Sequence, residues 1–272
     1  MIRDHRKRDM GQFFRRSVLA CFITAAALAV THAQWLKRPT PGVPRTADGQ
    51  LDWNAPAPHT ADGKPDFSGL WRATGVLSSR VQGQGLANLA NGAEIPMLPQ
   101  AQKVYQQNQA NGLKDMSSAQ CLPHGIPAAM LLPNLPFKIV QTPGLMLMLF
   151  EEFVDYRQIF TDGRELPTVV NPSWYGYSVG RWDNNSMVVE TIGFNDRTWL
   201  DLGGHTHSTA LRLTERLRRP DFGHLNIDLT IDDPETFVKS WSVRMPFVLF
   251  PDTELLEYVC ENEKSIVHMV GK

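Results

Sequence analysis

Residues 209–231 read TALRLTERLRRPDFGHLNIDLTI and carry the clearest fold signal of the chain. Odd positions from 211 to 217 hold Leu, Leu, Glu and Leu, whereas even positions from 212 to 218 hold Arg, Thr, Arg and Arg. Successive side chains of a strand point to opposite faces, so the odd face is expected to be inward. Pro220–Gly223 is turn chemistry, and alternation resumes at Leu225. The stretch therefore predicts two antiparallel strands, 209–218 and 225–231, joined by a tight turn.

The same alternation, punctuated by short turns, continues through most of the chain from residue 137 onward. Many short strands with regular turn signals favour a mainly β fold, and consecutive hairpins favour an antiparallel up-and-down β-barrel. One short helix is expected from Pro99 to Asn111, after a proline start. The other expected strands are Asp66–Arg72, Phe137–Gln141, Leu145–Phe153, Asp155–Thr161, Trp174–Trp182, Met187–Phe194, Lys239–Val248 and Glu254–Cys260.

The first 33 residues have the pattern of a secretory signal peptide. A basic region is followed by an apolar run from Val18 to Val30 and by Thr31-His32-Ala33, a small-residue cleavage site. The run is shorter than the ~20 residues needed to span a bilayer. We expect export to the periplasm or the extracellular space, and no membrane span after cleavage.

Residues 34–66 are expected to form an extended N-terminal arm, because the segment is rich in Pro and Gly and repeats Thr-Ala-Asp-Gly at 46–49 and 60–63. Residues 67–272 are expected to form a single barrel domain with an irregular or helical insertion at about 76–136. Six of the 27 basic and two of the 28 acidic residues precede position 34, which leaves 21 basic and 26 acidic. Such an acidic balance argues against a nucleic-acid partner.

Two cysteines remain after the signal segment, Cys121 and Cys260. In an exported protein an even pair most simply forms one disulfide. Free thiols or metal ligands are the alternative.

His205 and His207, two positions apart before the 209–218 strand, lead the candidate catalytic residues. Parity places both on the inward face with Glu215, and an inward carboxylate needs a partner. An imidazole titrates near neutral pH and suits proton transfer, with Glu190, Asp196 or Glu215 as the partner carboxylate. His224 follows the turn, so we expect it far from His205 and His207.

Aromatic residues supply the candidate substrate-binding wall. They are Trp174, Tyr175, Tyr177 and Trp199, on neighbouring strands and the following loop. Arg157 is expected either to hold an anionic group of the ligand or to pair with Glu151 or Glu190. The leading hypothesis is an enzyme that acts on a small aromatic or apolar compound by proton transfer: a lyase, an isomerase or a non-serine hydrolase.

Two alternatives stay open at this point. One is a binding protein without catalysis; the other is a metal-dependent enzyme with His205 and His207 as ligands to a divalent metal. Otherwise no cofactor is expected, and the oligomeric state is open. The chain has no Gly-x-Ser-x-Gly elbow, phosphate loop, dinucleotide fingerprint or Cys-x-x-Cys pair, so the common hydrolase, kinase, dehydrogenase and thioredoxin chemistries lack support.

Two stretches carry resemblances. Gly69-Leu70-Trp71 resembles the Gly-x-Trp that opens lipocalin-type (calycin) barrels, which implies a tryptophan closing the barrel floor. The motifs at 177–201, 204–208, 213–225 and 230–235 (YSVGRWDNNSMVVETIGFNDRTWLD, GHTHS, LTERLRRPDFGHL, TIDDPE) resemble a widespread family of predicted-secreted bacterial proteins. That resemblance spans roughly residues 40–265 and implies export without naming a reaction.

Overall fold

The computed structural model describes residues 39–74, 85–86 and 94–260. The expected signal peptide at 1–33 and parts of the expected insertion lie outside these residues. Within them, no helix is long and apolar enough to cross a membrane.

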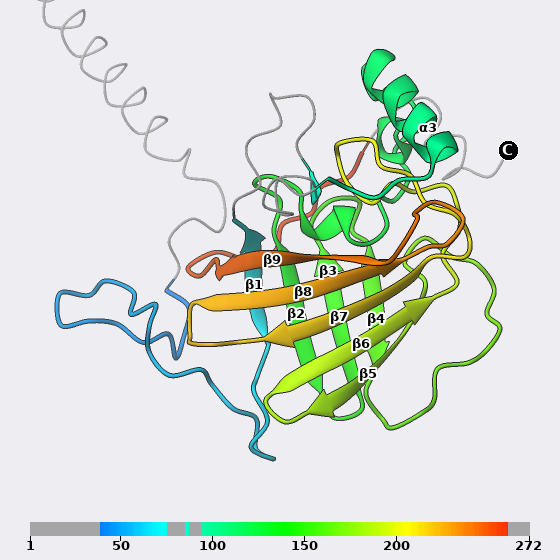
Figure 1. Cartoon of the computed structure of the whole chain (residues 1–272). Helices are drawn as coiled ribbons and strands as arrows, with labels where there is room; N and C mark the ends of the chain where they lie inside the picture. Colours follow the sequence, from blue (N-terminus) through cyan, green and yellow to red (C-terminus); the bar gives the residue numbers. More distant parts are fainter. Residues whose placement is uncertain (1–38, 75–84, 87–93, 261–272) are drawn as a thin grey trace, which may run out of the picture.

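Nine strands form one closed barrel in sequence order (Figure 1). Strands β5 to β9 lie in front in this view, and β1 to β4 lie behind. Strand β9 pairs with β1 and closes the ring. The strands are β1 (Gly69–Ala73), β2 (Phe137–Thr142), β3 (Leu145–Phe150), β4 (Tyr156–Phe160), β5 (Tyr177–Asp183), β6 (Ser186–Ile192), β7 (Arg212–Arg218), β8 (His224–Asp232) and β9 (Trp241–Leu249).

The predicted barrel is confirmed, but the prediction of a wholly antiparallel one is wrong at a single place. Strands β4 and β5 are parallel and share only the pairs Ile159↔Ser178 and Phe160↔Val179. Parallel neighbours need a connection that returns along the barrel, and residues 161–176 make it. We call this sparsely paired junction the seam.

Several strands also differ from expectation, and two of these differences bear on the site. The predicted strand 254–260 does not form; only Tyr258 makes an isolated bridge, to Glu152. Strand β7 begins at Arg212, so His205 and His207 precede it in a loop and the parity argument does not reach them.

The alternation that predicted β7 holds inside the strand. Leu213, Glu215 and Leu217 are buried, whereas Arg212 and Thr214 are exposed. Side chains from all nine strands fill the interior together with residues of the insertion. Burial of this apolar surface, at about 25 cal/mol per Å², is the main stabilising contribution.

One end of the barrel is its floor, where the hairpin turns of β2–β3, β5–β6 and β7–β8 lie. Trp71 is fully buried there, and its indole N–H donates to the Phe67 carbonyl at 2.9 Å. The Arg219 guanidinium lies over the Trp71 ring at 4.9 Å and donates to the carbonyls of Asp66 and Ser68. Trp71 therefore packs across this end of the barrel.

The opposite end is covered by the described residues of the insertion and by residues 193–211 (Figure 1). We call residues 193–211 the histidine loop. The predicted helix is α3, Pro99–Ala110, and two 3₁₀ turns follow at Ser117–Gln120 and Ala128–Met130. In Figure 1, α3 stands above this end of the barrel. Asn108 of α3 donates to the Gly204 carbonyl at 3.0 Å, so the helix is tied to the histidine loop.

Residues 39–68, called the arm below, make the two predicted turns. Gly49 and Gly63 have φ of 80° and 77°, and each N–H bonds to the carbonyl of the threonine three residues earlier. The arm is anchored to the C-terminal side of the barrel by an ion pair of 2.7 Å between Arg45 and Asp252. The predicted disulfide, Cys121–Cys260, is present.

Candidate functional site

His205 is buried and paired with a carboxylate within its own loop. Its Nδ1 lies 2.8 Å from Oδ2 of Asp201, and the Tyr105 ring of α3 stacks on the imidazole at 4.4 Å between centroids. Asp201 also accepts the backbone N–H groups of Leu86, Gly203 and His205. This carboxylate ties the loop to the separate segment at Leu86, which is a structural role.

His207 uses both ring nitrogens inside the same loop. Nδ1 donates to the Ser208 carbonyl at 2.9 Å, which leaves Nε2 to accept from the Thr198 hydroxyl at 2.7 Å. Burial lowers the pKa of His207 below its ordinary value, because the charged imidazolium would lose its hydration in the buried site. The residue is therefore a neutral, fully bonded histidine.

The metal hypothesis gains no further ligand from the described part of the chain, where no group of three His, Cys, Asp or Glu residues is placed to hold an ion. His205 and His207 turn to different partners, Asp201 and Thr198. The hypothesis stays a prediction.

Glu215 lies inside the barrel, paired with Arg157. Both are 1% exposed, and the guanidinium contacts both carboxylate oxygens, one of them at 3.0 Å. The other Arg157 donors reach the hydroxyls of Ser178 at 3.1 Å and Thr191 at 2.8 Å. The expected inward carboxylate is real, but its partner is Arg157 and not a histidine, and Arg157 pairs with neither Glu151 nor Glu190.

The remaining sequence candidates lie elsewhere. Glu190 points outward and pairs with Arg181 at 3.2 Å, both being more than 40% exposed. Asp196 is exposed on the histidine loop, and Trp199 is buried in it. The five predicted catalytic residues thus occupy three separate regions: the histidine loop, the barrel interior and the outer face of β6.

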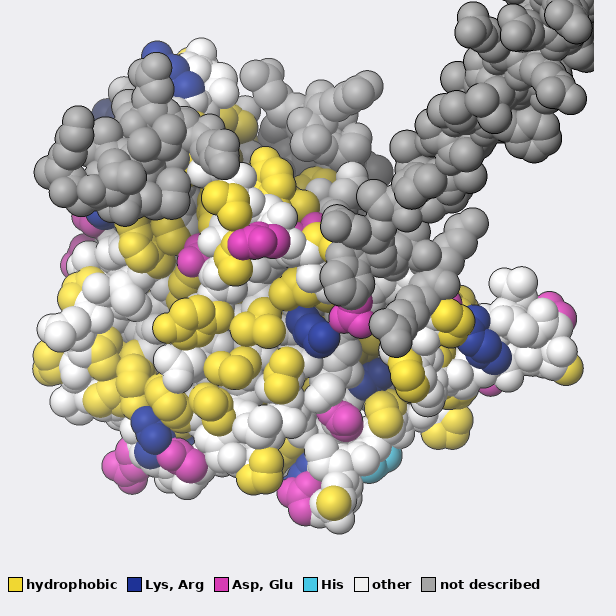
Figure 2. Space-filling view, turned by 180° about the vertical axis from the view of Figure 1, so that it is seen from behind, with side chains coloured by type: hydrophobic (Ala, Val, Ile, Leu, Met, Phe, Trp, Pro, Cys, Tyr) yellow, Lys and Arg dark blue, Asp and Glu magenta, His cyan; other side chains and the backbone are white. Residues whose placement is uncertain are grey.

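Four of the five predicted substrate-binding residues do come together, at the seam. Arg157, Trp174, Tyr175 and Tyr177 all line a cavity of about 390 Å³ between β4 and the segment that enters β5. Tyr156 and Phe160, on the outer face of β4, complete its aromatic wall. Hydrophobic side chains are spread over the face of the barrel seen from behind (Figure 2). We call the cavity lined by Arg157, Trp174, Tyr175 and Tyr177 the seam cavity.

A carboxylate stands at the wall of the seam cavity. Asp155 accepts a hydrogen bond of 2.9 Å from the Tyr175 hydroxyl, and the Tyr175 ring stacks on Phe150 at 5.4 Å. Partial burial raises the pKa of Asp155, and the nearby Glu152 carboxylate adds to the rise. Burial and the Asp155 carboxylate likewise raise the pKa of Tyr175, which keeps the phenol protonated.

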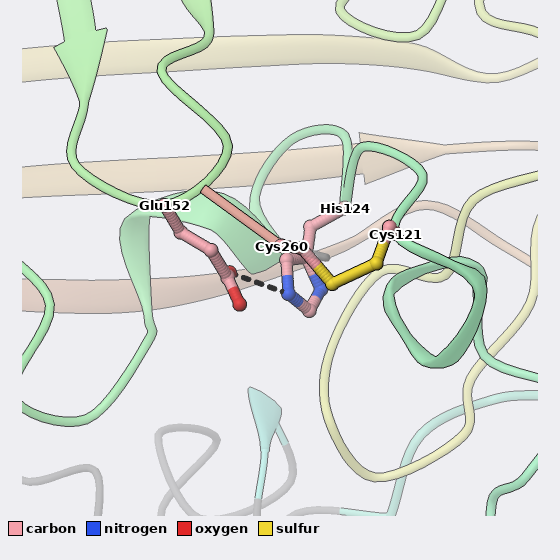
Figure 3. Close-up of a disulfide and its surroundings, with 4 residues drawn as sticks. All are labelled: Cys121, His124, Glu152 and Cys260. Carbon is pink, nitrogen blue, oxygen red and sulfur yellow. Dashed lines mark ion pairs between the residues drawn. A yellow bond between two sulfur atoms is a disulfide. The ribbon is translucent and has the colours of Figure 1, made fainter. Parts of the chain in front are cut away.

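A second pair, His124 and Glu152, lies beside the disulfide (Figure 3), close enough to Asp155 to act on its carboxylate. Nε2 of His124 is 2.7 Å from Oε2 of Glu152, and the side chains are 5% and 13% exposed. The two atoms are in close contact without an aligned hydrogen bond, since neither has a hydrogen-bond partner in the described part of the chain. His124 is therefore a buried imidazole with an unsatisfied nitrogen facing a carboxylate.

The backbone between the two carboxylates is strained. Phe153 and Val154 have φ of 64° and 56°, a region that bulky and β-branched residues rarely enter. The turn is closed by the Phe150 N–H on the Asp155 carbonyl at 2.8 Å. Such strain costs of order 1–3 kcal/mol per residue and concentrates at functional sites. We call residues 151–155 the acidic turn.

Asp155, Glu152 and His124 were not among the sequence candidates for catalysis. Their signals were the Glu-Glu-x-x-Asp that interrupts an otherwise apolar strand and a histidine three residues after a disulfide cysteine. Neither pattern specifies a partner, because the contacts join segments that are distant along the chain.

No protein-family model, curated protein or solved structure matches this chain. The resemblances noted in the sequence stay predictions.

Proposed function

We propose that the protein binds a small aromatic or apolar organic compound in the seam cavity and acts on it by proton transfer through Asp155. The observation that carries the proposal is a carboxyl group of raised pKa at the wall of an aromatic-lined cavity. The volume of about 390 Å³ suits a small molecule. The reaction classes are those expected from the sequence: a lyase, an isomerase or a non-serine hydrolase, exported to the periplasm or beyond.

Each group has a role that its environment supports. Asp155 exchanges the proton, because a raised pKa brings a carboxyl closer to the working range of a general acid or base. Tyr175 stays protonated, so it orients Asp155 as a hydrogen-bond donor. The Glu152 carboxylate, in contact with His124, lies near Asp155 and contributes to the raised pKa of Asp155.

The roles assigned to His205, His207 and Glu215 are not carried into this proposal. His205 Nδ1 is held by Asp201, both ring nitrogens of His207 are bonded within the histidine loop, and Glu215 is paired with Arg157. An apolar ligand would gain its affinity from Trp174 and Tyr177, and the same wall would serve a binding protein without catalysis, which is the second candidate function.

The test is deuterium exchange into a panel of small aromatic ketones and phenols in D2O, followed by NMR, together with a binding titration of each compound. The wild type is expected to exchange protons of at least one compound, Asp155→Asn to lose about 100-fold or more of that rate, and Asp196→Asn to behave as wild type. An exchange that requires protonated Asp155 should fall as the pH rises through its elevated pKa.

Two results would redirect the proposal. Binding that Trp174→Ala abolishes, without exchange in the wild type, would select the binding protein. Exchange or binding that is indifferent to both Asp155→Asn and Trp174→Ala would refute the site.

A further inference from the structure

A second cavity lies where the arm meets the floor end of the barrel, remote from the acidic turn. Its volume is about 630 Å³, and its walls come from the arm, from β1 and β8, and from the chain at the end of β9. Trp53 and Phe250 are its aromatic members; Arg72 and His224 are its basic ones. We call it the arm cavity.

The arm is held in place by specific bonds, so the cavity is a built feature. The carbonyls of Trp53 and Ala55 accept the N–H groups of Gly223 and Phe222 at 2.9 and 2.8 Å. A β-carbon at Gly223 would lie 2.7 Å from the Trp53 ring and 2.9 Å from its carbonyl. Only glycine allows this close approach of the arm to the β7–β8 turn.

Arg72 brings a cation to the cavity, and no carboxylate among the described residues pairs with it. The Arg72 guanidinium lies over the Phe250 ring at 4.7 Å. A guanidinium on an aromatic face retains its in-plane N–H donors, which suit a carboxylate, sulfonate or phosphate.

His224 is oriented by an acid on its far side. Its Nδ1 lies 2.7 Å from Oδ1 of Asp221, the atom that also accepts the N–H groups of Gly223 and His224. The carboxylate fixes Nδ1 as the donor, which leaves Nε2 as the nitrogen for a ligand, either as acceptor or, when protonated, as donor. The imidazole is 40% exposed, so a ligand in the cavity can reach it.

We propose that the arm cavity binds a small aromatic anion. Its acidic group would sit on Arg72 and His224, and its ring would pack between Trp53 and Phe250. The ligand class follows from the Arg72 guanidinium, which has no ion pair among the described residues, and from the exposed His224 imidazole beside aromatic walls. The site is independent of the seam cavity and its proposed chemistry.

The experiment compares two probes of similar shape on the full protein. 8-Anilinonaphthalene-1-sulfonate carries an anion, and N-phenyl-1-naphthylamine lacks it. Arg72→Gln is expected to weaken binding of the sulfonate probe by about tenfold or more, as measured by fluorescence titration. Its affinity for the neutral probe should stay within twofold of the wild-type value. The matched control is Arg244→Gln, an exposed arginine of β9 that pairs with Asp228 outside the cavity.

Further variants separate this site from others. Trp53→Ala should weaken both probes, whereas Trp174→Ala in the seam cavity should leave the sulfonate affinity unchanged. Equal loss of both probes in Arg72→Gln, or a sulfonate affinity within twofold of wild type, would overturn the proposal. Thermal unfolding of each variant establishes that the fold is intact, and competition by benzoate but not by benzyl alcohol or inorganic phosphate confirms the ligand class.

Discussion

Breaking the Arg157–Glu215 pair should destabilise the barrel far more than breaking an ion pair on its surface. Both side chains are 1% exposed, so Glu215→Gln leaves a guanidinium in the interior without a counter-charge. Removing one partner of a buried pair costs about 3–5 kcal/mol. At about 2–4 °C per kcal/mol for a domain of this size, the melting temperature should fall by roughly 6–20 °C.

The matched control is Glu190→Gln, which breaks the exposed pair with Arg181 on the neighbouring strands β5 and β6. Exposed pairs contribute about 0–1 kcal/mol, so this variant should be close to wild type. The assay is urea unfolding followed by tryptophan fluorescence, with thermal unfolding as a second measurement.

A double variant, Arg157→Met with Glu215→Leu, separates lost pairing from a stranded charge. Ser178 and Thr191 lie 3.0 Å apart and can bond to each other when the guanidinium is gone. The double variant should therefore recover most of the stability, since apolar replacement of a buried pair is often neutral or stabilising. Single variants within about 1 kcal/mol of wild type, or a double variant as unstable as the sum of the singles, would refute this reasoning.

Three further predictions concern the covered end of the barrel. His207 is neutral in the fold and its pKa is lowered, so the unfolded chain binds more protons than the folded one below pH 6.5. The free energy of unfolding should therefore fall as the pH drops through that range. Urea titrations at several pH values should show a shallower fall for His207→Gln than for the wild type. Cys121→Ser opens a loop with a sequence separation of 139 and should lower the free energy of unfolding by on the order of 4–5 kcal/mol, measured by thermal unfolding. Reductant should produce the same loss in the wild type, and a loss under about 1 kcal/mol would contradict the prediction. Gly125→Ala should lower the free energy of unfolding in urea by about 1–3 kcal/mol more than Gly112→Ala does. Both glycines have positive φ, but only a β-carbon at position 125 would meet the Thr198 side chain, at 2.8 Å. Equal losses in the two variants would show that the contact relaxes.

Period-two alternation explains why most of the barrel could be predicted. Leu213, Glu215 and Leu217 alternate with polar residues, and that local pattern depends only on which face is buried. The parallel seam could not be predicted in the same way, because the pairing of β4 with β5 is decided by the path of residues 161–176 and not by either strand's own pattern.

The candidate site shows the same division between local and distant information. The aromatic residues of 174–177 were found because neighbours in sequence share one wall. The histidines were misplaced because residues 205–207 lie in a loop where no strand parity applies. Glu215 was correctly placed inward, but its partner Arg157 lies on β4. The alternation within β7 does not indicate which residue of a distant strand faces Glu215.

The seam also divides the barrel for folding. Strands β2–β4 and β5–β9 are two meanders, each built from neighbours in sequence, and such local pairings form early. The β1–β9 junction joins segments that are far apart along the chain, so its loop-closure entropy is larger. The β4–β5 junction has only two residue pairs to offset the closure of residues 161–176, so we expect these two junctions to close last. The seam cavity lies at the β4–β5 junction, which is one of these late junctions. A compound bound there would contact both meanders and slow their separation.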